Sequence, residues 1–406
     1  MSYSLLIKNC GQLLTMKGRS SVDLGLIEDA FLACEGNKIK AVGRMEDLGK
    51  FKSLVTKKTK VIDAQGNVVM PGLIDCHTHL VFAGNRANEF KMKLEGKSYL
   101  DILEAGGGIL STVRATRKAS KAQLLKNAGG HLSEMLKMGI TTIEAKSGYG
   151  LDMDTEIKIL EVLRELKKLQ PVKIVSTFLG AHTVPAEFKD RADEYLEVLM
   201  KKVLPAVKKL ATFVDIFCEK KAFSLEQSRK YLSYAKKLGF KIKIHGEQIN
   251  NLGACVMAAK LGAVSVDHAD RLSKRDIQEL AKSSAVVVLL PLVPLFLRED
   301  VFADGRALID GGCKVAVSTD FNPGSAPCKN LFLAMTLACL KMGLKTEEAL
   351  RAVTINAAAA LDLSKQVGSL EKGKIADILI TKVKNYQEIP YWMGENPVAR
   401  VILEGK

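Results

Sequence analysis

The chain has 406 residues, of which 47% are hydrophobic and 26% charged, an ordinary globular composition that allows more than one structural unit. No apolar run approaches the roughly 18–20 residues of a membrane-spanning helix, and the N-terminal stretch "MSYS" has neither the basic nor the long apolar region of a secretory signal. The net charge of +15 comes largely from short lysine pairs, several in amphipathic segments, and only 6% of residues are aromatic, so we expect no nucleic-acid or membrane partner. The positive field instead favours a small anionic ligand.

Eight cysteines are scattered singly through the chain, and none forms a C-x-x-C pair. A domain of this size needs no disulfide bonds to be stable. We therefore expect reduced thiols and a cytoplasmic location.

The first 65 residues alternate short apolar strands with tight turns. The segments "AFLACEGNKIKAVG" and "KVIDAQGNVVMPG" surround the turn pairs Gly36-Asn37 and Gly66-Asn67 with alternating apolar residues. Such patterns predict a β-hairpin at each turn. We therefore assign residues 1–68 to a β-rich unit.

From Pro71 onward, apolar runs typical of strands alternate with segments of helical period. In residues 121–139, for example, five apolar side chains share one helical face: Leu124, Ala128, Leu132, Met135 and Leu136. Eight strands alternating with helices over roughly 250 residues predict a (β/α)8 barrel, which we assign to residues 69–360. The predicted strands are residues 72–80, 140–150, 172–182, 213–220, 241–248, 263–270, 285–291 and 314–324.

The C-terminal region returns to strand-like sequence. The segment "TEEALRAVTINAAAALDL" predicts one more helix, and "GSLEKGKIADILI" and "ARVILEGK" are typical of strands. We therefore expect residues 361–406 to join residues 1–68 in a small composite β-sandwich domain.

Polar side chains gather where the predicted barrel strands end. His77 and His79 follow the apolar part of the first strand, and their spacing places both on the same face. The C-terminal ends of barrel strands form the face where active sites lie. Other predicted strands also end in candidate residues: Tyr149 at the second, His182 at the third, His245 with Gln248 at the fifth, His268 at the sixth and Asp320 at the eighth. Five of the six histidines thus fall at strand ends, whereas His131 lies within a helix and is interpreted as structural.

Paired imidazoles, a third imidazole from another strand and a carboxylate from a fourth form a ligand set that suits zinc, iron or another borderline divalent metal. With no cysteine involved, such a set leaves a position open for water. Since a metal of this kind lowers the pKa of bound water to about 7, the pattern indicates a hydrolase.

Several motifs carry a more particular resemblance. "VMPGLIDCHTHL" and "TINAAAALDL" followed by "GSLEKGKIADILI" resemble the opening and closing segments of the amidohydrolase superfamily. The segments "FAGNRANEF", "GGGILSTVRATR", "KSGYGLD", "FLGAHTVP", "HGEQINNLG" and "STDFNPGSAP" together resemble the imidazolonepropionase family, over essentially the whole chain.

That resemblance implies hydrolytic ring opening of 4-imidazolone-5-propanoate to N-formimidoyl-glutamate, with one metal ion, Zn²⁺ or Fe³⁺, and a dimer, which is common in the family. It implies the metal ligands His77, His79, His245 and Asp320. The implied substrate contacts are Arg86, Tyr149, His182, Gln248, Asn322, Gly324 and Ser325.

The expected roles follow from the chemistry of these side chains. Some relatives have glutamate at the position of Gln248, but an amide cannot ionise, so proton transfer is expected from His268, from Asp320 or from both. His182 is expected to stabilise the developing oxyanion together with the metal. Arg86 offers a guanidinium fork that suits the propionate carboxylate.

The sequence leaves three other functions open. Another amidohydrolase, a deaminase or a different cyclic amidase, would share the metal site but differ in the carboxylate contact. A catalytically silent barrel would typically lack a metal ligand, and all four are present here. A nucleic-acid binder would need a basic segment interleaved with aromatic residues, a pattern that the sequence lacks.

Overall fold

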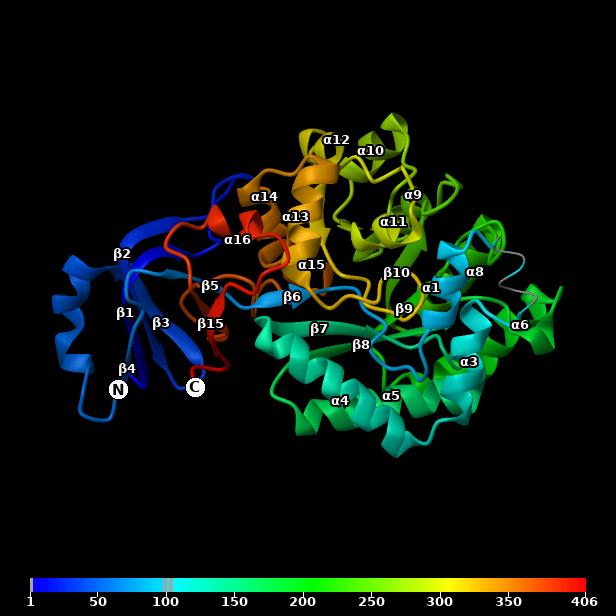
Figure 1. The fold of residues 1–406 in the computed structure, drawn as a ribbon, viewed down its shortest axis with the longest axis horizontal. Coiled ribbons are helices and arrows are strands. Elements are labelled where there is room, and N and C mark those ends of the chain that lie inside the picture. The colour runs from blue at the N-terminus through cyan, green and yellow to red at the C-terminus, as the bar shows by residue number, and fades with distance from the viewer. Residues whose placement is uncertain (1–2, 98–100, 102–104) are drawn as a thin grey trace.

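The computed structural model describes residues 3–97, 101 and 105–406, so Met1 and Ser2 of the N-terminal stretch lie outside the described residues. Figure 1 shows a β-sheet domain that contains both chain termini beside a larger barrel with helices around it. The larger body confirms the predicted (β/α)8 barrel.

The eight barrel strands pair in chain order, and every pair between neighbours is parallel. Each lies within one of the eight predicted segments, because buried parallel strands are continuous apolar runs. The first and last strands are joined by a bridge between Thr78 and Phe321, just beyond their C-terminal ends, which closes the cylinder. The strands are β6 (Leu73–Asp75), β7 (Ile140–Lys146), β8 (Lys173–Ala181), β9 (Phe213–Ile216), β10 (Lys241–Gly246), β11 (Ser265–His268), β12 (Val286–Leu289) and β13 (Lys314–Val317).

Helices cover the outside of the barrel, and several begin at side chains that cap their free N–H groups. Ser224 and Ser273 form capping boxes, and Ser120 and Asp152 each accept a backbone N–H. The helices are α1 (Ala87–Leu94), α3 (Ile109–Lys118), α4 (Lys121–Lys137), α5 (Met153–Leu169), α6 (Ala192–Val198), α7 (Leu204–Val207), α8 (Leu225–Lys237), α9 (Ala254–Lys260), α10 (Lys274–Ala281), α11 (Leu292–Leu297), α12 (Gly305–Asp310), α13 (Leu331–Met342), α14 (Thr346–Ala352), α15 (Ile355–Ala360) and α16 (Glu388–Tyr391). A 3₁₀-helical segment spans Met45–Leu54, a short 3₁₀ turn lies at Ala186–Phe188 and a π-helical turn at Leu199–Val203.

The segment expected to form a single helix after residue 345 is broken in two. α14 ends before Thr354, whose backbone (φ −130°, ψ −99°) is not helical, and α15 begins at the next residue. The Thr354 hydroxyl donates to the carbonyl of Leu350, so a side chain satisfies the end of α14. The single-helix expectation was wrong because the apolar periodicity continues across this break.

Asp75 joins the two ends of the barrel. Its fully buried carboxylate accepts hydrogen bonds from the Ser318 hydroxyl, from the Thr319 N–H at 3.0 Å and from the Thr319 hydroxyl at 2.7 Å. Burial raises the pKa of Asp75 to about 6, and these donors oppose the rise. The carboxylate therefore holds the segment after β13 against β6.

We expect Asp75→Ala to lower the free energy of unfolding by about 3 kcal/mol, because it leaves three buried donors without their charged acceptor. Urea unfolding followed by circular dichroism measures this change. The control is Asp310→Ala, which removes an exposed carboxylate paired with Arg306 and should cost less than about 1 kcal/mol. Equal losses in the two variants would contradict this role for Asp75.

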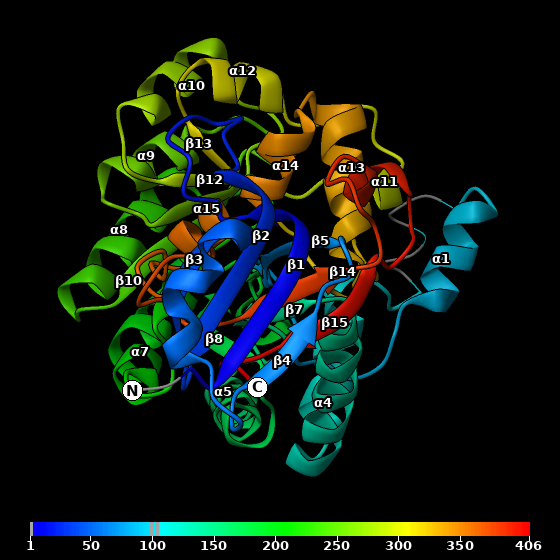
Figure 2. The same cartoon turned by 90° about the vertical axis from the view of Figure 1, so that its left-hand side faces the viewer.

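The β-domain is built from both ends of the chain, as Figure 2 shows face on. All seven strands belong to one hydrogen-bonded sheet. Each strand contributes side chains to one common core. The expected sandwich is therefore built from one continuous sheet around this core. Its last N-terminal strand, β5, begins at Val68, so the expected boundary after residue 68 falls within that strand. The strands are β1 (Leu5–Leu14), β2 (Leu26–Glu35), β3 (Lys38–Arg44), β4 (Lys60–Asp63), β5 (Val68–Pro71), β14 (Ile378–Thr381) and β15 (Val398–Ile402).

One of the two expected hairpins is present. β2 and β3 pair antiparallel around Gly36-Asn37. The second is wrong, because β4 and β5 do not pair with each other, and both run parallel to β1 in succession. Between β4 and β5 the chain contains one residue more than the facing part of β1. The turn at Gln65-Gly66 accommodates this residue without reversing the direction of the chain.

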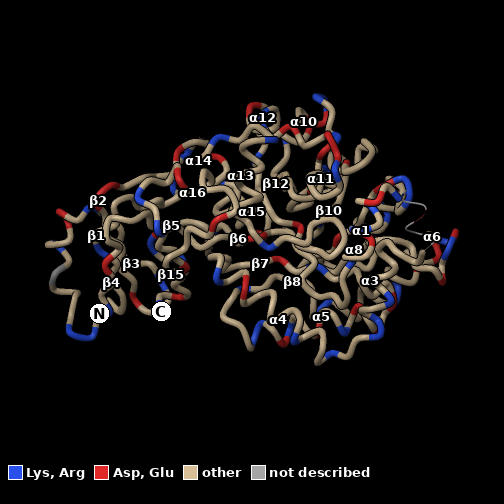
Figure 3. The backbone as a smooth tube through the Cα atoms, in the orientation of Figure 1, with Lys and Arg blue, Asp and Glu red and all other residues tan. Residues whose placement is uncertain are grey.

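The surface carries both signs of charge. Figure 3 shows basic and acidic positions intermixed along the helices and loops. Among the described residues, no helix combines the length and apolar character needed to cross a bilayer. All eight cysteines are described, and all are free thiols, as expected.

Candidate active site

The segment after β6 carries His77 and His79 across the mouth of the barrel. Backbone bonds fix it to the segment after β13: the Asp320 N–H donates to the His77 carbonyl at 3.1 Å, and the His79 N–H donates to the Phe321 carbonyl at 2.9 Å. The Ser318 hydroxyl accepts from the His77 N–H at 2.7 Å. These bonds explain why residues some 240 positions apart in the sequence share one site.

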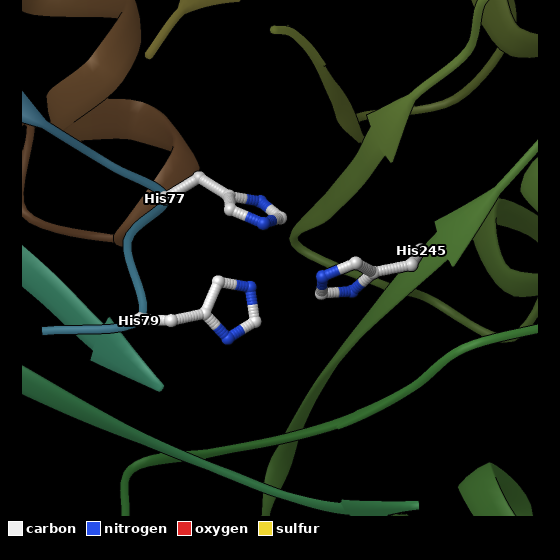
Figure 4. Close-up of side chains that lie close together, drawn as sticks. All are labelled: His77, His79 and His245. Carbon is white, nitrogen blue, oxygen red and sulfur yellow. The ribbon is translucent and has the colours of Figure 1, made fainter. Parts of the chain in front are cut away.

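The site brings together all four predicted metal ligands. Nitrogen atoms of His77, His79 and His245 lie within 4.8 Å of one another, and Figure 4 shows the three imidazoles turned toward one another. Asp320 Oδ1 lies 3.4 Å from His77 Nε2 and 3.3 Å from His79 Nε2. All four side chains are buried.

These residues fit a metal ion. Among the described residues, His77 Nε2, His245 Nε2 and Asp320 Oδ1 are buried and lack a hydrogen-bond partner. Buried polar atoms left unpaired cost roughly 1–3 kcal/mol each, so several of them converging on one point indicate a binding site for a cation. Three imidazoles and a carboxylate are the donor set of catalytic zinc and iron sites.

His268 lies beside this cluster, at the end of β11. Its ring centre is 5.2 Å from that of His245 and 5.7 Å from that of His77. His268 (φ 77°), the following Ala269 (φ 63°) and Asp320 (φ 51°) have left-handed backbone conformations. Such strain costs roughly 1–3 kcal/mol per residue and is concentrated at functional sites.

The protonation states of this pair suit proton transfer. Burial lowers the pKa of His268 to about 4, so its imidazole is neutral near pH 7. Burial alone would raise the pKa of Asp320, but the close approach of the His77 and His79 imidazoles holds it well below its usual range. Both groups can therefore accept a proton.

His182 and Tyr149 form one wall of the site. The His182 ring stacks on that of His79 with centres 5.0 Å apart, and Tyr149 lies 5.5 Å from His182. Burial lowers the pKa of His182 to about 3. Its Nδ1 lies 3.1 Å from the Gly148 carbonyl, which can only accept, so Nδ1 carries the proton and Nε2 is an acceptor. This tautomer does not fit the expectation that His182 donates to an oxyanion.

Arg86 lies against the loop that follows Asp320. Its Nε donates to the Thr112 hydroxyl at 3.0 Å, and its charge opposes the rise in the pKa of Tyr149 that burial causes. A Cβ atom at Gly324 would lie only 2.2 Å from Arg86 Nη1. Glycine at this position therefore leaves room for the guanidinium.

We expect Gly324→Ala to displace Arg86 and to raise KM for a carboxylate substrate roughly tenfold, the loss of about 1.4 kcal/mol of a charged contact. Steady-state kinetics measures this effect. The control, Gly130→Ala, adds a methyl group where no atom lies within 4 Å. An unchanged KM in Gly324→Ala would contradict the proposed contact, and in an Arg86→Ala background the substitution should have no further effect.

The loop itself is organised by Asn322. The Asn322 side chain donates to the Asp320 carbonyl at 2.6 Å and accepts from the N–H groups of Gly324 and Ser325, each at 2.8 Å. These bonds shape the loop beside Asp320. Gln248 is half-buried and lies two residues beyond β10.

A group of buried charges beneath the site was missed from the sequence. Glu144, Lys146, Asp215, Lys243 and Asp267 are all fully buried within barrel strands. The available signal was the presence of charged residues inside otherwise apolar strands, and one of them, Lys243, lies two residues before His245 and therefore on the same face of β10. His131, expected to be structural, packs between Phe82 and Phe321.

Comparison with known proteins agrees with this site. Residues 68–406 match the amidohydrolase family. The chain is 45% identical to imidazolonepropionase of Alkaliphilus metalliredigens, over 100% of this chain and 98% of that protein, and 46% identical to imidazolonepropionase of Bacillus cytotoxicus, over 99% and 96%. A zinc-bound adenosine deaminase from Xanthomonas campestris shares the fold, with a TM-score of 0.73 at 18% identity over 100% of this chain and 92% of that chain. The chain therefore belongs to the amidohydrolase family and, within it, to the imidazolonepropionases.

Proposed function

We propose that this protein hydrolyses 4-imidazolone-5-propanoate to N-formimidoyl-L-glutamate, a step of histidine degradation. The observation that carries the proposal is the position of Arg86 against the Asp320 loop, where a cation faces a site built for metal-dependent hydrolysis. The full-length similarity to imidazolonepropionases supports the same substrate. The reaction adds water to the ring carbonyl carbon and breaks the bond from that carbon to nitrogen.

The family and the cluster of histidines and aspartate support a bound metal ion, which we propose to be Zn²⁺ or Fe³⁺. His77, His79, His245 and Asp320 would hold it. When bound, it lowers the pKa of water to about 7 and polarises the ring carbonyl.

The protein side chains orient the substrate and move the protons. Arg86 binds the propionate carboxylate through its planar fork. We assign binding of the ring N–H to the His182 Nε2 acceptor and binding of the ring oxygen to the Tyr149 hydroxyl. Asp320 takes the proton from the attacking water, and His268 orients that water or shares its proton, a contribution of roughly 10²–10⁴ in rate. The same proton then passes to the ring nitrogen as its bond to carbon breaks.

The test is a substrate panel. Loss of the imidazolone absorbance and mass-spectrometric detection of N-formimidoyl-glutamate are the expected result. Adenosine, guanine and cyclic amides such as hydantoin represent the alternative amidohydrolases and should react at least about 10³ times more slowly, because they lack the carboxylate. If any of these compounds is turned over faster than imidazolonepropionate, the proposed substrate is wrong and that compound identifies the activity.

We further propose a homodimer that acts in the cytoplasm on a small anionic substrate. The free cysteines and the net charge of +15 support this setting. Sedimentation at micromolar concentration tests the dimer, and a species of one chain mass would contradict it.

A further inference from the structure

The barrel interior contains a network of five charged side chains. Lys146 Nζ lies 2.7 Å from Asp215 Oδ2, 3.0 Å from Glu144 Oε2 and 3.4 Å from Asp267 Oδ2. Lys243 Nζ lies 3.0 Å from Glu144 Oε1. All five side chains are fully buried, so their mutual contacts replace water.

Two of these carboxylates also contact ligand imidazoles. Asp267 Oδ2 is hydrogen-bonded to His77 Nδ1 at 2.7 Å, and Asp215 Oδ2 lies 3.0 Å from His245 Nδ1, in close contact but without the geometry of a hydrogen bond. In each carboxylate, the oxygen that meets the imidazole is the oxygen that meets Lys146.

The other oxygen of each carboxylate is fixed separately. Asp267 Oδ1 accepts from the Ser265 hydroxyl at 2.6 Å, and Asp215 Oδ1 accepts from the Ile216 N–H at 2.8 Å. Neither carboxylate is therefore free to rotate away from its histidine. A carboxylate on Nδ1 sets the tautomer that leaves Nε2 free for a metal.

We propose that Lys146 is a positioning residue that holds His77 and His245 in their metal-binding orientation through Asp267 and Asp215. Lys146 is the group, among the described residues, that contacts both histidine-bound carboxylates. The inference rests on the metal site of the proposed function but not on the identity of the substrate.

The ammonium also explains why this place is not a second metal site. Atoms of His77, Glu144 and Asp267 lie within 4.8 Å of one another, as metal ligands do. Lys146 already supplies a cation to both carboxylates of that group. Without it, like charges in the dry interior would repel one another and release the imidazoles.

The test compares Lys146→Met with Lys243→Met. Both variants remove a fully buried ammonium, but that of Lys243 contacts Glu144 and the Cys76 carbonyl, not a histidine-bound carboxylate. Chelator competition on metal-stripped protein should show Zn²⁺ binding weakened by roughly 10–100-fold in Lys146→Met and by less than about threefold in Lys243→Met. The visible spectrum of bound Co²⁺ should change in the first variant alone.

Equal weakening in both variants, or an unchanged dissociation constant in Lys146→Met, would overturn the proposal. If Lys146→Met does not fold, Asp267→Asn is compared with Glu144→Gln. Both variants remove a negative charge beside Lys146, but only Asp267→Asn removes the charged partner of an imidazole. Asp267→Asn should weaken Zn²⁺ binding roughly tenfold relative to Glu144→Gln, and equal constants would overturn the proposal. A wild-type chain that binds Zn²⁺ but leaves imidazolonepropionate intact would contradict the proposed substrate alone.

Discussion

Replacing Asp320 by asparagine should lower kcat for imidazolonepropionate hydrolysis by at least about 10³-fold, because we propose that this one carboxylate both binds the metal and accepts the proton. Asparagine keeps the shape of the side chain and tolerates the left-handed backbone of this position, φ 51°. The loss is therefore expected in catalysis and not in folding.

Steady-state kinetics at saturating Zn²⁺, with thermal unfolding in parallel, measures both quantities. Asp310→Asn is the matched control, since this exposed carboxylate pairs with Arg306 far from the barrel mouth, at the end of α12. A kcat within tenfold of wild type in Asp320→Asn would exclude Asp320 as the main proton acceptor and leave His268 in that role.

Replacing Arg86 by alanine should raise KM for imidazolonepropionate by roughly 10–100-fold, the loss of about 1.5–3 kcal/mol of a charged hydrogen bond. The effect should fall mainly on KM, because the carboxylate is bound alike in the ground state and the transition state. Arg164→Ala, which removes an exposed arginine paired with Glu161, is the control.

A second comparison separates recognition of the carboxylate from general damage to the site. With the amide analogue of the substrate, wild type and Arg86→Ala should have similar KM values, because the analogue carries no charge for the guanidinium to bind. A KM for the carboxylate substrate that does not change in Arg86→Ala would remove the main structural support for the proposed substrate.

The barrel and the rim of the site could be predicted from the sequence because both depend on local pattern. Apolar runs marked all eight strands, and His77, His79, His245 and Asp320 stood at strand ends that a closed cylinder must bring together. The composite β-domain followed from strand-like sequence at both termini.

The features that were missed depend on contacts between distant residues. The turn after β4 has the sequence of a hairpin, but both flanking strands pair with β1, a partner that local pattern cannot specify. The charges of Lys146 and Asp267 are 121 residues apart, so the sequence did not reveal their contact. The contact of His182 Nδ1 with the Gly148 carbonyl, from which we infer the tautomer of His182, became visible with the structure.

A titration of metal-stripped protein with Zn²⁺, with imidazolonepropionate hydrolysis followed at each addition, tests directly whether one metal ion at the barrel mouth is required for the reaction. We expect activity to rise linearly and to saturate at one equivalent of metal per chain, and we expect His77→Ala neither to bind that equivalent nor to regain activity. Full activity in stripped protein holding less than about a tenth of an equivalent, or undiminished recovery in His77→Ala, would contradict a single-metal site at the barrel mouth.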